Sequence, residues 1–260
     1  MIRLDHVTKT YRTQRGELVR ALEDITLHVR ENEFVTIVGQ SGCGKSTLLK
    51  LVAGLVSVSD GSIHVRDQLV HEPFRDVGIV FQDPVLLPWR TVFGNVMFSI
   101  EMLGLDAERS RDRARMLLDL AGLGAFETKF PRELSGGMQQ RVAICRALVH
   151  DPGLLLMDEP FGALDAMTRE EMSFELLRIW DERRKTILFV THSIPEAILL
   201  ADRVVVMTPR PGRIAEVLEI ELPRPRTVQL EFDERFKAYS QAIRAHIFAS
   251  RGERNVAALA

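Results

Sequence analysis

A glycine-rich stretch at residues 39–46, "GQSGCGKS", has the residue types that hold phosphate. It matches the pattern G-x-x-x-x-G-K-[ST] and stands between a buried-strand run, "FVTIVG", and a helical segment, as that pattern requires. Glycines let backbone N–H groups turn toward phosphate oxygens, and the following helix adds its positive N-terminal end. Lys45 is placed for β- and γ-phosphates and Ser46 for Mg²⁺. The stretch predicts a nucleotide-binding loop; the alternative is a glycine-rich turn with an incidental lysine.

The residues expected to surround the phosphates are consecutive. Cys43 within them is read as a small filler and not as a nucleophile, although a helix N-terminus lowers the pKa of a thiol and would make Cys43 oxidisable. The full set is Gly39, Gln40, Ser41, Gly42, Cys43, Gly44, Lys45, Ser46 and Thr47.

A second stretch, "LLLMDE" at residues 154–159, ends an apolar strand in two acids. An acid at the carboxyl end of a buried parallel strand emerges where such sheets bind ligands. Asp158 is expected to hold Mg²⁺ through its water shell, and Glu159 to orient or deprotonate an attacking water. The pair favours hydrolysis over nucleotide storage; the alternative is an ordinary solvated loop start.

A third stretch, "LSGGMQQR" at residues 134–141, places two glycines after a capping serine, Ser135. An exposed helix N-terminus of this kind is an anion site. Taken alone it could be a flexible cap. Together with the loop at 39–46, it gives one chain two phosphate-binding helix ends.

The elements that must position these residues alternate. A half-buried strand is expected at 24–32, where Ile25, Leu27 and Val29 recur at period two. Further strands are expected at 34–39, 61–70, 76–82, 154–158, 186–192 and 203–207. Helices lie between them, with capping-box spacing at Thr168 and Ser193. This alternation predicts an α/β fold with a mostly parallel sheet covered on both faces.

Two regions depart from the alternation. The pattern of residues from about 84 to 151 predicts three helices, which indicates a helical lobe inserted between core strands. The tail, 223–260, is expected to form an amphipathic helix with Phe236, Tyr239, Ile243 and Ile247 as its apolar stripe. The predicted domain is thus 1–222. "RPGR" at 210–213 and "PRPR" at 223–226 read as turn or linker, with a basic docking patch as the alternative.

Composition narrows the class of protein. The 260 residues are 46% hydrophobic and 27% charged, with a net charge of −2, so no global positive field would attract nucleic acid. No apolar run approaches the roughly 20 residues that span a bilayer, and the N-terminus has no signal-peptide core. Cys43 and Cys145 lack metal-type spacing, which favours a reducing, cytosolic setting.

With these motifs in this order, the chain resembles the ATP-binding cassette (ABC) ATPases over residues 2–214. The resemblance implies a P-loop NTPase (RecA-like) core with an N-terminal antiparallel β-subdomain and an inserted α-helical subdomain. It makes residues 39–46 the Walker A loop, 154–158 the Walker B strand, and 163–165 the D-loop. ATP and Mg²⁺ are the implied cofactors.

The resemblance also implies roles for single residues. Glu159 would be the general base, His192 the γ-phosphate sensor, Gln82 the Q-loop residue that couples metal and water to the helical lobe, and Tyr11 the aromatic on the adenine. In this family two subunits pair head to tail, so Ser135, Gly136 and Gly137 would complete the partner's site, with Asp165 beside them; Ser46, Gln82 and Asp158 would serve the metal. One departure is Ser193, where the family commonly has Asp.

Each of these roles has a plainer alternative. Tyr11 could be a strand aromatic, His192 structural, Gln82 polar surface and Asp165 only the cap of the next helix.

Two further stretches, "FQDPVLLPWRTVFGNV" and "MTPRPGRI", resemble importer cassettes for nitrate, sulfonate, taurine and related small solutes, or for pyrimidine precursors. The implied protein is an ATP-hydrolysing subunit that works as a homodimer, with membrane permease subunits and, indirectly, a solute-binding protein. It would lie peripherally on the cytoplasmic face of the inner membrane. The segment "VLLPW" either receives a permease coupling helix or packs the helical lobe, and both can hold.

Two other classes of protein are compatible with part of these motifs. A soluble ABC factor acting on nucleic acid or ribosomes usually has a long coiled-coil insertion or two cassettes, whereas here the segment between Gln82 and Ser135 is short and one Walker A is present. A small-molecule P-loop kinase would leave "LSGGMQQR" unexplained.

Overall fold

The computed structural model describes residues 1–257, with side chains described as far as residue 248. The chain divides into two compact units. The first, called here the terminal unit, comprises Met1–Phe74 and Thr186–Ala260; the second, the central unit, is Arg75–Lys185. In the described part of the chain, no helix has the length and apolar character needed to cross a bilayer.

The terminal unit contains a four-stranded antiparallel sheet in the order β2-β1-β4-β5. Ile25, Leu27 and Val29 are buried at alternate positions of β2, as the period-two pattern predicted. The single strand predicted at 61–70 is wrong, because positive φ values at Arg66 (49°) and Asp67 (63°) form a two-residue hairpin turn there. The strands are β1 (Ile2–Arg12), β2 (Leu18–Val29), β4 (Asp60–Val65) and β5 (Gln68–Leu69).

A second group of strands in the terminal unit has the order β10-β9-β3-β8. β3 pairs in parallel with both β8 and β9, and every residue of β3 and β8 is buried, as expected of strands covered on both faces. β10 is antiparallel to β9 and was not predicted from the sequence. The strands are β3 (Phe34–Gly39), β8 (Thr186–Val190), β9 (Arg203–Met207) and β10 (Ile214–Glu219).

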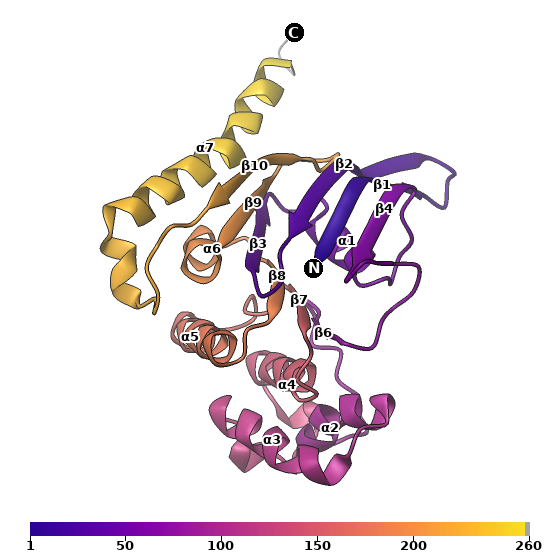
Figure 1. Ribbon diagram of the computed structural model, residues 1–260, viewed down its shortest axis with the longest axis vertical. Helices are drawn as coiled ribbons and strands as arrows, with labels where there is room; N and C mark the ends of the chain where they lie inside the picture. The colour runs from indigo at the N-terminus through magenta and orange to yellow at the C-terminus, as the bar shows by residue number, and fades with distance from the viewer. Residues whose placement is uncertain (258–260) are drawn as a thin grey trace. The chain divides into compact units, whose positions relative to one another are not determined.

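Three α-helices and a short 3₁₀ turn complete the terminal unit. α7 packs against α6, β9 and β10, and Figure 1 shows it running alongside β10. The predicted tail stripe is confirmed: Phe236 and Ile243 are buried in an apolar cluster with α6, and Tyr239 and Ile247 pack against it. The helices are α1 (Lys45–Val52), α6 (Ile194–Leu200), η3 (Val228–Phe232) and α7 (Glu234–Ala257).

The tail is also fixed by two arginines. The Arg226 guanidinium, buried at 6% exposure, donates to the carbonyls of Ile198, Leu199, Ala201 and Ile220 at 2.6–3.3 Å. Arg224 donates to Leu200 O at 3.2 Å and to an Asp202 carboxylate oxygen at 2.8 Å. The last carbonyls of a helix have no intrahelical partner, and cations are favourable at that end. The "PRPR" segment lies outside the helices and strands, as the turn or linker interpretation predicted, and its arginine side chains in addition cap α6.

In the central unit, β6 and β7 pair in parallel, and the helices α2, α3 and α4 pack on one another. The three helices predicted between 84 and 151 are confirmed, with Thr91, Asp106 and Ser135 as their N-caps. The elements are β6 (Val77–Val80), α2 (Val92–Leu103), α3 (Ala107–Leu120), η1 (Gly124–Phe126), η2 (Pro131–Glu133), α4 (Gly136–Leu148), β7 (Leu154–Asp158) and α5 (Ala166–Glu182).

Asp151 is the centre of an ion cluster in the central unit. Its carboxylate accepts from Arg113 at 2.9 Å, Arg183 at 2.6 Å and Lys185 at 2.6 Å. Burial acts to raise the pKa of Asp151, but these cations outweigh it, so the pKa lies below its ordinary value. The cluster ties the ends of α4 and α5 to α3.

Candidate nucleotide-binding site

Residues 39–47, called here the phosphate loop, connect β3 to α1. The shape of this loop depends on its own glycines and on Lys45. Gly42 and Gly44 have positive φ values of 74° and 111°, and Gly44 is the N-cap of α1. The Lys45 ammonium is buried and donates to Gly39 O at 3.0 Å and to Gln40 O at 3.1 Å. Lysine has three donors, and two of them close the loop on itself. Ser41 and Gly42 are exposed, so a polyanion can reach the loop.

The back of this loop rests on two neighbours that the sequence did not reveal. A Cβ at Gly212 would stand well inside van der Waals contact of the Cys43 carbonyl oxygen, and one at Gly44 would lie 2.6 Å from Leu22 Cδ2. Gly212 also donates to Ala21 O at 2.9 Å and accepts from the Glu23 amide at 3.0 Å. The "RPGR" turn, predicted as a loop, is therefore a direct support of the phosphate loop.

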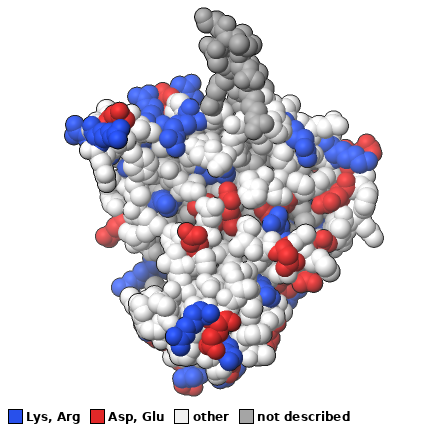
Figure 2. Space-filling model, turned by 180° about the vertical axis from the view of Figure 1, so that it is seen from behind, with Lys and Arg blue, Asp and Glu red and all other residues white. Residues whose placement is uncertain are grey.

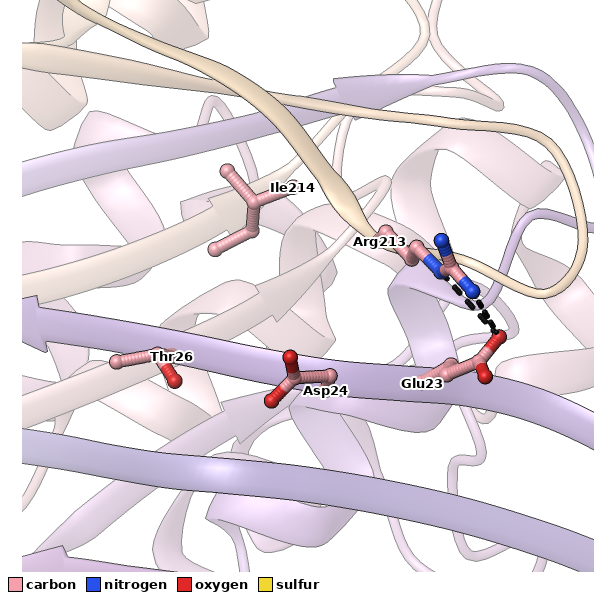
Figure 3. A pocket seen from close by; sticks show the side chains of 5 residues that line it. All are labelled: Glu23, Asp24, Thr26, Arg213 and Ile214. Atoms are coloured by element: carbon pink, nitrogen blue, oxygen red, sulfur yellow. Dashed lines mark hydrogen bonds and ion pairs between the residues drawn. The ribbon is translucent and has the colours of Figure 1, made fainter.

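An ion pair closes this support at the surface. Arg213 at the end of the "RPGR" turn faces Glu23 in β2, with Arg213 Nη2 2.8 Å from Glu23 Oε2 (Figure 3). Asp24, Thr26 and Ile214 line the same cavity, which measures about 480 Å³. The ion pair links the turn that carries Gly212 to β2.

Cys43 does not behave as the helix-end argument predicted. Its side chain is 1% exposed, and burial raises the pKa of the thiol; the nearby Lys45 charge, which lowers it, is the weaker effect. The expectation of an oxidisable thiol is therefore wrong for this conformation, and the interpretation of Cys43 as a small filler holds.

Tyr11 and His192 are the other predicted residues in the terminal unit. Tyr11 is 37% exposed near the end of β1, with the Lys9 ammonium 5.0 Å from its ring centroid. His192 is exposed just after β8, where Thr191 Oγ1 accepts from the Ser193 amide at 3.0 Å. Ser193 caps α6 by accepting from Glu196 N at 3.4 Å, as predicted. The Tyr11 and His192 side chains are therefore both accessible to a ligand.

The acidic pair ends β7 in the central unit. Asp158 is buried at 4% exposure, whereas Glu159 is half-buried with φ = 47°. The left-handed region is unfavourable for a glutamate, and such strain concentrates at functional sites. The backbone thus holds Glu159 in a costly conformation at the position predicted for the general base.

The stretch "LSGGMQQR" at residues 134–141, called here the signature segment, contains the N-terminus of α4. Ser135 accepts from Met138 N at 3.3 Å, which confirms the predicted cap. A Cβ at Gly137 would lie 3.2 Å from Leu164 Cδ2 and 3.5 Å from Ala163 O, so the signature and the predicted D-loop are side by side. In contrast, a Cβ at Gly136 would meet no atom within 4 Å. The packing of the described residues does not require glycine at position 136.

Asp165 is the N-cap of α5, accepting from Thr168 N at 3.0 Å. The capping box predicted at Thr168 is therefore wrong, because the helix begins at Ala166. Capping by Asp165, which the sequence left as an alternative, is what the structure shows.

Gln82 is exposed two residues beyond β6. Beside it lies a residue that sequence reasoning missed. Gln140, fully buried on α4, donates from Nε2 to the Phe81 carbonyl at 3.0 Å and so ties the signature helix to the segment that carries Gln82. In the sequence, Gln140 is visible only as an amide among the apolar residues of this helix.

A second missed residue, Asn95, shapes the loop that contains "VLLPW". It is fully buried; its Oδ1 accepts from Leu87 N at 2.8 Å, and its Nδ2 donates to the carbonyls of Leu87, Arg90 and Thr91 at 3.0–3.1 Å. This loop presents Val85 at 61% and Trp89 at 71% exposure, whereas Leu86 and Leu87 are half-buried. One amide thus holds an exposed apolar loop in a defined shape.

The predicted residues divide between the units. The terminal unit brings together the phosphate loop, its Gly212 support and, on the same unit, Tyr11 and His192. The central unit brings together the signature glycines and the D-loop, with Asp158, Glu159 and Gln82 at the ends of its parallel strands.

Comparisons with known proteins show the family to which the chain belongs. Residues 22–162 match the ABC transporter family. The chain is 46% identical to the taurine import ATP-binding protein TauB of Rhizobium johnstonii over 224 residues, covering 86% of each chain. It is 43% identical to the aliphatic sulfonates import ATP-binding protein SsuB of Bacillus cereus over 230 residues, covering 88% of this chain and 90% of that one.

A solved structure shows the same fold. The dimeric post-hydrolysis state of the ATP-binding cassette MJ0796, bound to ADP and Pi, superposes with a TM-score of 0.78 at 33% identity and covers 86% of this chain and 100% of that chain. The predicted fold class, a P-loop core with an antiparallel β-subdomain and an inserted helical subdomain, is confirmed. On its motifs, fold and relatives, this chain belongs to the ABC transporter family.

Proposed function

We propose that this ABC-type ATPase powers the uptake of a small solute through a partner permease. The solute class suggested by the relatives is a taurine- or sulfonate-like anion, with nitrate and related compounds as neighbours in the sequence resemblance. The proposed location is the cytoplasmic face of the inner membrane, where the chain would bind permease subunits and work indirectly with a solute-binding protein.

The proposal depends mainly on the open space around Gly136, where an added Cβ would meet no atom within 4 Å. The chain has two helix ends suited to phosphate, at α1 and α4, and the second presents a glycine that the chain's own packing leaves room to replace. A nucleotide approaching that helix end closely would need the glycine, because a Cβ would stand in its path. This supports a head-to-tail homodimer in which Ser135, Gly136 and Gly137 of each chain, with Asp165, complete the other chain's site.

The residues present fit ATP and Mg²⁺. Gly39 to Thr47 offer backbone N–H groups, an α-helix N-terminus and the Lys45 ammonium to phosphates, and Tyr11 an accessible ring to adenine. Ser46, Asp158 and Gln82 are oxygen donors, the ligand type that Mg²⁺ prefers, and they are the proposed metal ligands. When bound, the ion would neutralise charge on the β- and γ-phosphates.

The chain's own residues then supply the rest of the chemistry. Glu159 is proposed to orient and deprotonate the attacking water, and His192 to donate a hydrogen bond to the γ-phosphate. Lys45 stabilises the negative charge that develops on phosphate oxygens. Hydrolysis removes the phosphate that holds the dimer together, and reopening of the dimer drives the permease.

Gly136→Ala tests this proposal. Alanine is accommodated by the fold and is a better helix former than glycine by up to about 1 kcal/mol, so the melting temperature should stay the same or rise slightly. ATP-driven dimerisation, measured by sedimentation or light scattering in the Glu159→Gln background, should weaken about tenfold, because crowding of the partner's nucleotide by the added Cβ would cost about 1.4 kcal/mol of binding free energy.

A matched substitution is Ala163→Gly, which removes a methyl group from the neighbouring D-loop instead of adding one to the signature. It should cost stability through chain entropy and leave the steric path to position 136 open. If Gly136→Ala dimerises with ATP as readily as the wild type, the signature does not face a partner's nucleotide and the proposed dimer is wrong.

The permease side of the proposal rests on the loop held by Asn95. Its exposed Trp89 and Val85 form an apolar surface of the kind that receives a partner helix. Trp89→Ser should lower solute uptake in cells several-fold, whereas ATP hydrolysis by the isolated chain stays within about twofold, because an exposed side chain contributes little to the fold. A parallel drop in both activities would show that Trp89 serves the ATPase itself.

The nucleic-acid rival is not favoured by the net charge or by the face of the described residues that Figure 2 shows. On the face shown in Figure 2, Lys and Arg side chains of the described residues lie among Asp and Glu side chains, and the net charge of the chain is −2. A nucleic-acid surface would be expected to gather cations along one stripe. Nucleic acid is therefore not among the proposed partners.

A further inference from the structure

The tail segment, defined as residues 223–248, reaches the phosphate loop directly. The Gln40 side chain donates from Nε2 to the main-chain carbonyl of Ile247 at 2.8 Å. Gln40 follows Gly39 in the loop, and its own carbonyl accepts from the Lys45 ammonium at 3.1 Å. Gln40 therefore contacts Lys45 of the phosphate loop through its backbone and α7 through its side chain.

The part of α7 that makes this contact is held in place by buried apolar side chains. Ile243, one turn before Ile247, is fully buried in the cluster that joins α7 to α6, and Phe236 anchors the first turn at 4% exposure. Figure 1 shows α7 alongside β10, so its position is set by the sheet that also carries the phosphate loop at the end of β3. The Arg226 cap on α6 fixes the start of the tail segment. The Ile247 carbonyl is thus held by packing on a rigid surface.

We propose that the tail segment is a positioning element of the nucleotide site: docking of α7 and binding of nucleotide to the phosphate loop favour each other, with Gln40 as the positioning residue that links them. This inference rests on the proposed function only in that residues 39–47 bind the nucleotide. Coupling of this kind is reciprocal, so nucleotide must steady α7 by the same factor by which α7 strengthens nucleotide binding.

The test uses MgADP, which binds one chain without turnover, and the full-length protein. Ile243→Ala loosens α7 and should weaken MgADP binding at least fivefold by calorimetry. Gln40→Ala removes the link, so adding Ile243→Ala to it should cause no further loss. Hydrogen exchange of amides 240–248 should slow when MgADP binds to the wild type and stay unchanged when it binds to Gln40→Ala.

Ile63→Ala is the matched control, since Ile63 is equally apolar, 2% exposed and lies in β4 of the antiparallel sheet. It should lower the melting temperature without moving MgADP affinity. If Ile243→Ala also lowers only the melting temperature, or if it weakens binding equally with and without Gln40, the inference is overturned.

The exchange experiment on the wild type decides the question even if Ile243→Ala fails to fold. MgADP binding without slower exchange in α7 overturns the coupling and leaves the ATPase proposal standing. A wild type that does not bind MgADP at all contradicts the proposed function itself.

Discussion

Replacing Glu159 with glutamine is expected to reduce the turnover number for ATP hydrolysis by about 100-fold or more, because a positioned general base contributes 10²- to 10⁴-fold. Glutamine keeps the size and hydrogen-bonding capacity of the side chain but cannot accept the proton of the attacking water. ATP binding should be preserved, since the phosphates are held by the loop at 39–47. Phosphate release at saturating ATP, together with equilibrium binding of ATP, measures both quantities.

The backbone at this position supplies an independent control. Glu159 has φ = 47°, a conformation that glycine adopts without strain. Glu159→Gly should therefore lose hydrolysis as fully as Glu159→Gln while its melting temperature does not fall. Unchanged hydrolysis in the glutamine variant would remove Glu159 from the mechanism, and a large drop in stability of the glycine variant would show that the side chain serves the fold.

Gly212→Ala is expected to weaken ATP binding about 30-fold. The added Cβ would overlap the Cys43 carbonyl and crowd Leu22, so the phosphate loop or its support must move. Overpacking of this kind costs about 2 kcal/mol, and that amount expressed in the binding step corresponds to about 30-fold. Calorimetric titration with MgATP in the Glu159→Gln background would measure the change without interference from hydrolysis.

Gly78→Ala separates this effect from a general loss of stability. A Cβ at Gly78 would also meet a main-chain carbonyl, that of Ala147, but within the central unit. It should lower the melting temperature as much as Gly212→Ala does, with a much smaller change in MgATP affinity. Equal losses of affinity in the two variants would mean that Gly212 does not support the phosphate loop specifically.

The sequence was sufficient for those residues whose chemistry restricts their type. Glycines with positive φ, a lysine at a helix start and an acid at the end of an apolar strand each leave a readable pattern, so the loop at 39–46 and the pair at 158–159 could be predicted. The helix caps at Ser135 and Ser193 followed from the same kind of local rule.

The supports of the site left no such pattern. Gln40 and Arg226 donate to main-chain carbonyls, which every residue has, so the accepting side of each bond is invisible in the sequence. Gly212 meets Cys43 only because two loops far apart in the chain pack together. For Cys43 itself, helix end and burial act on the pKa in opposite directions, and only the structure shows that burial is stronger.

The arginine cap on α6 bears on how such cassettes can be recombined. The last carbonyls of α6 receive their donors from Arg224 and Arg226, which lie beyond residue 222, the predicted end of the cassette domain. A hybrid that joins this core to a relative's tail would inherit bare carbonyls unless the new tail also brings a cation to that helix end. In a hybrid, therefore, the core and its first tail residues form a single exchangeable module, and a junction is better placed after residue 226 than before it.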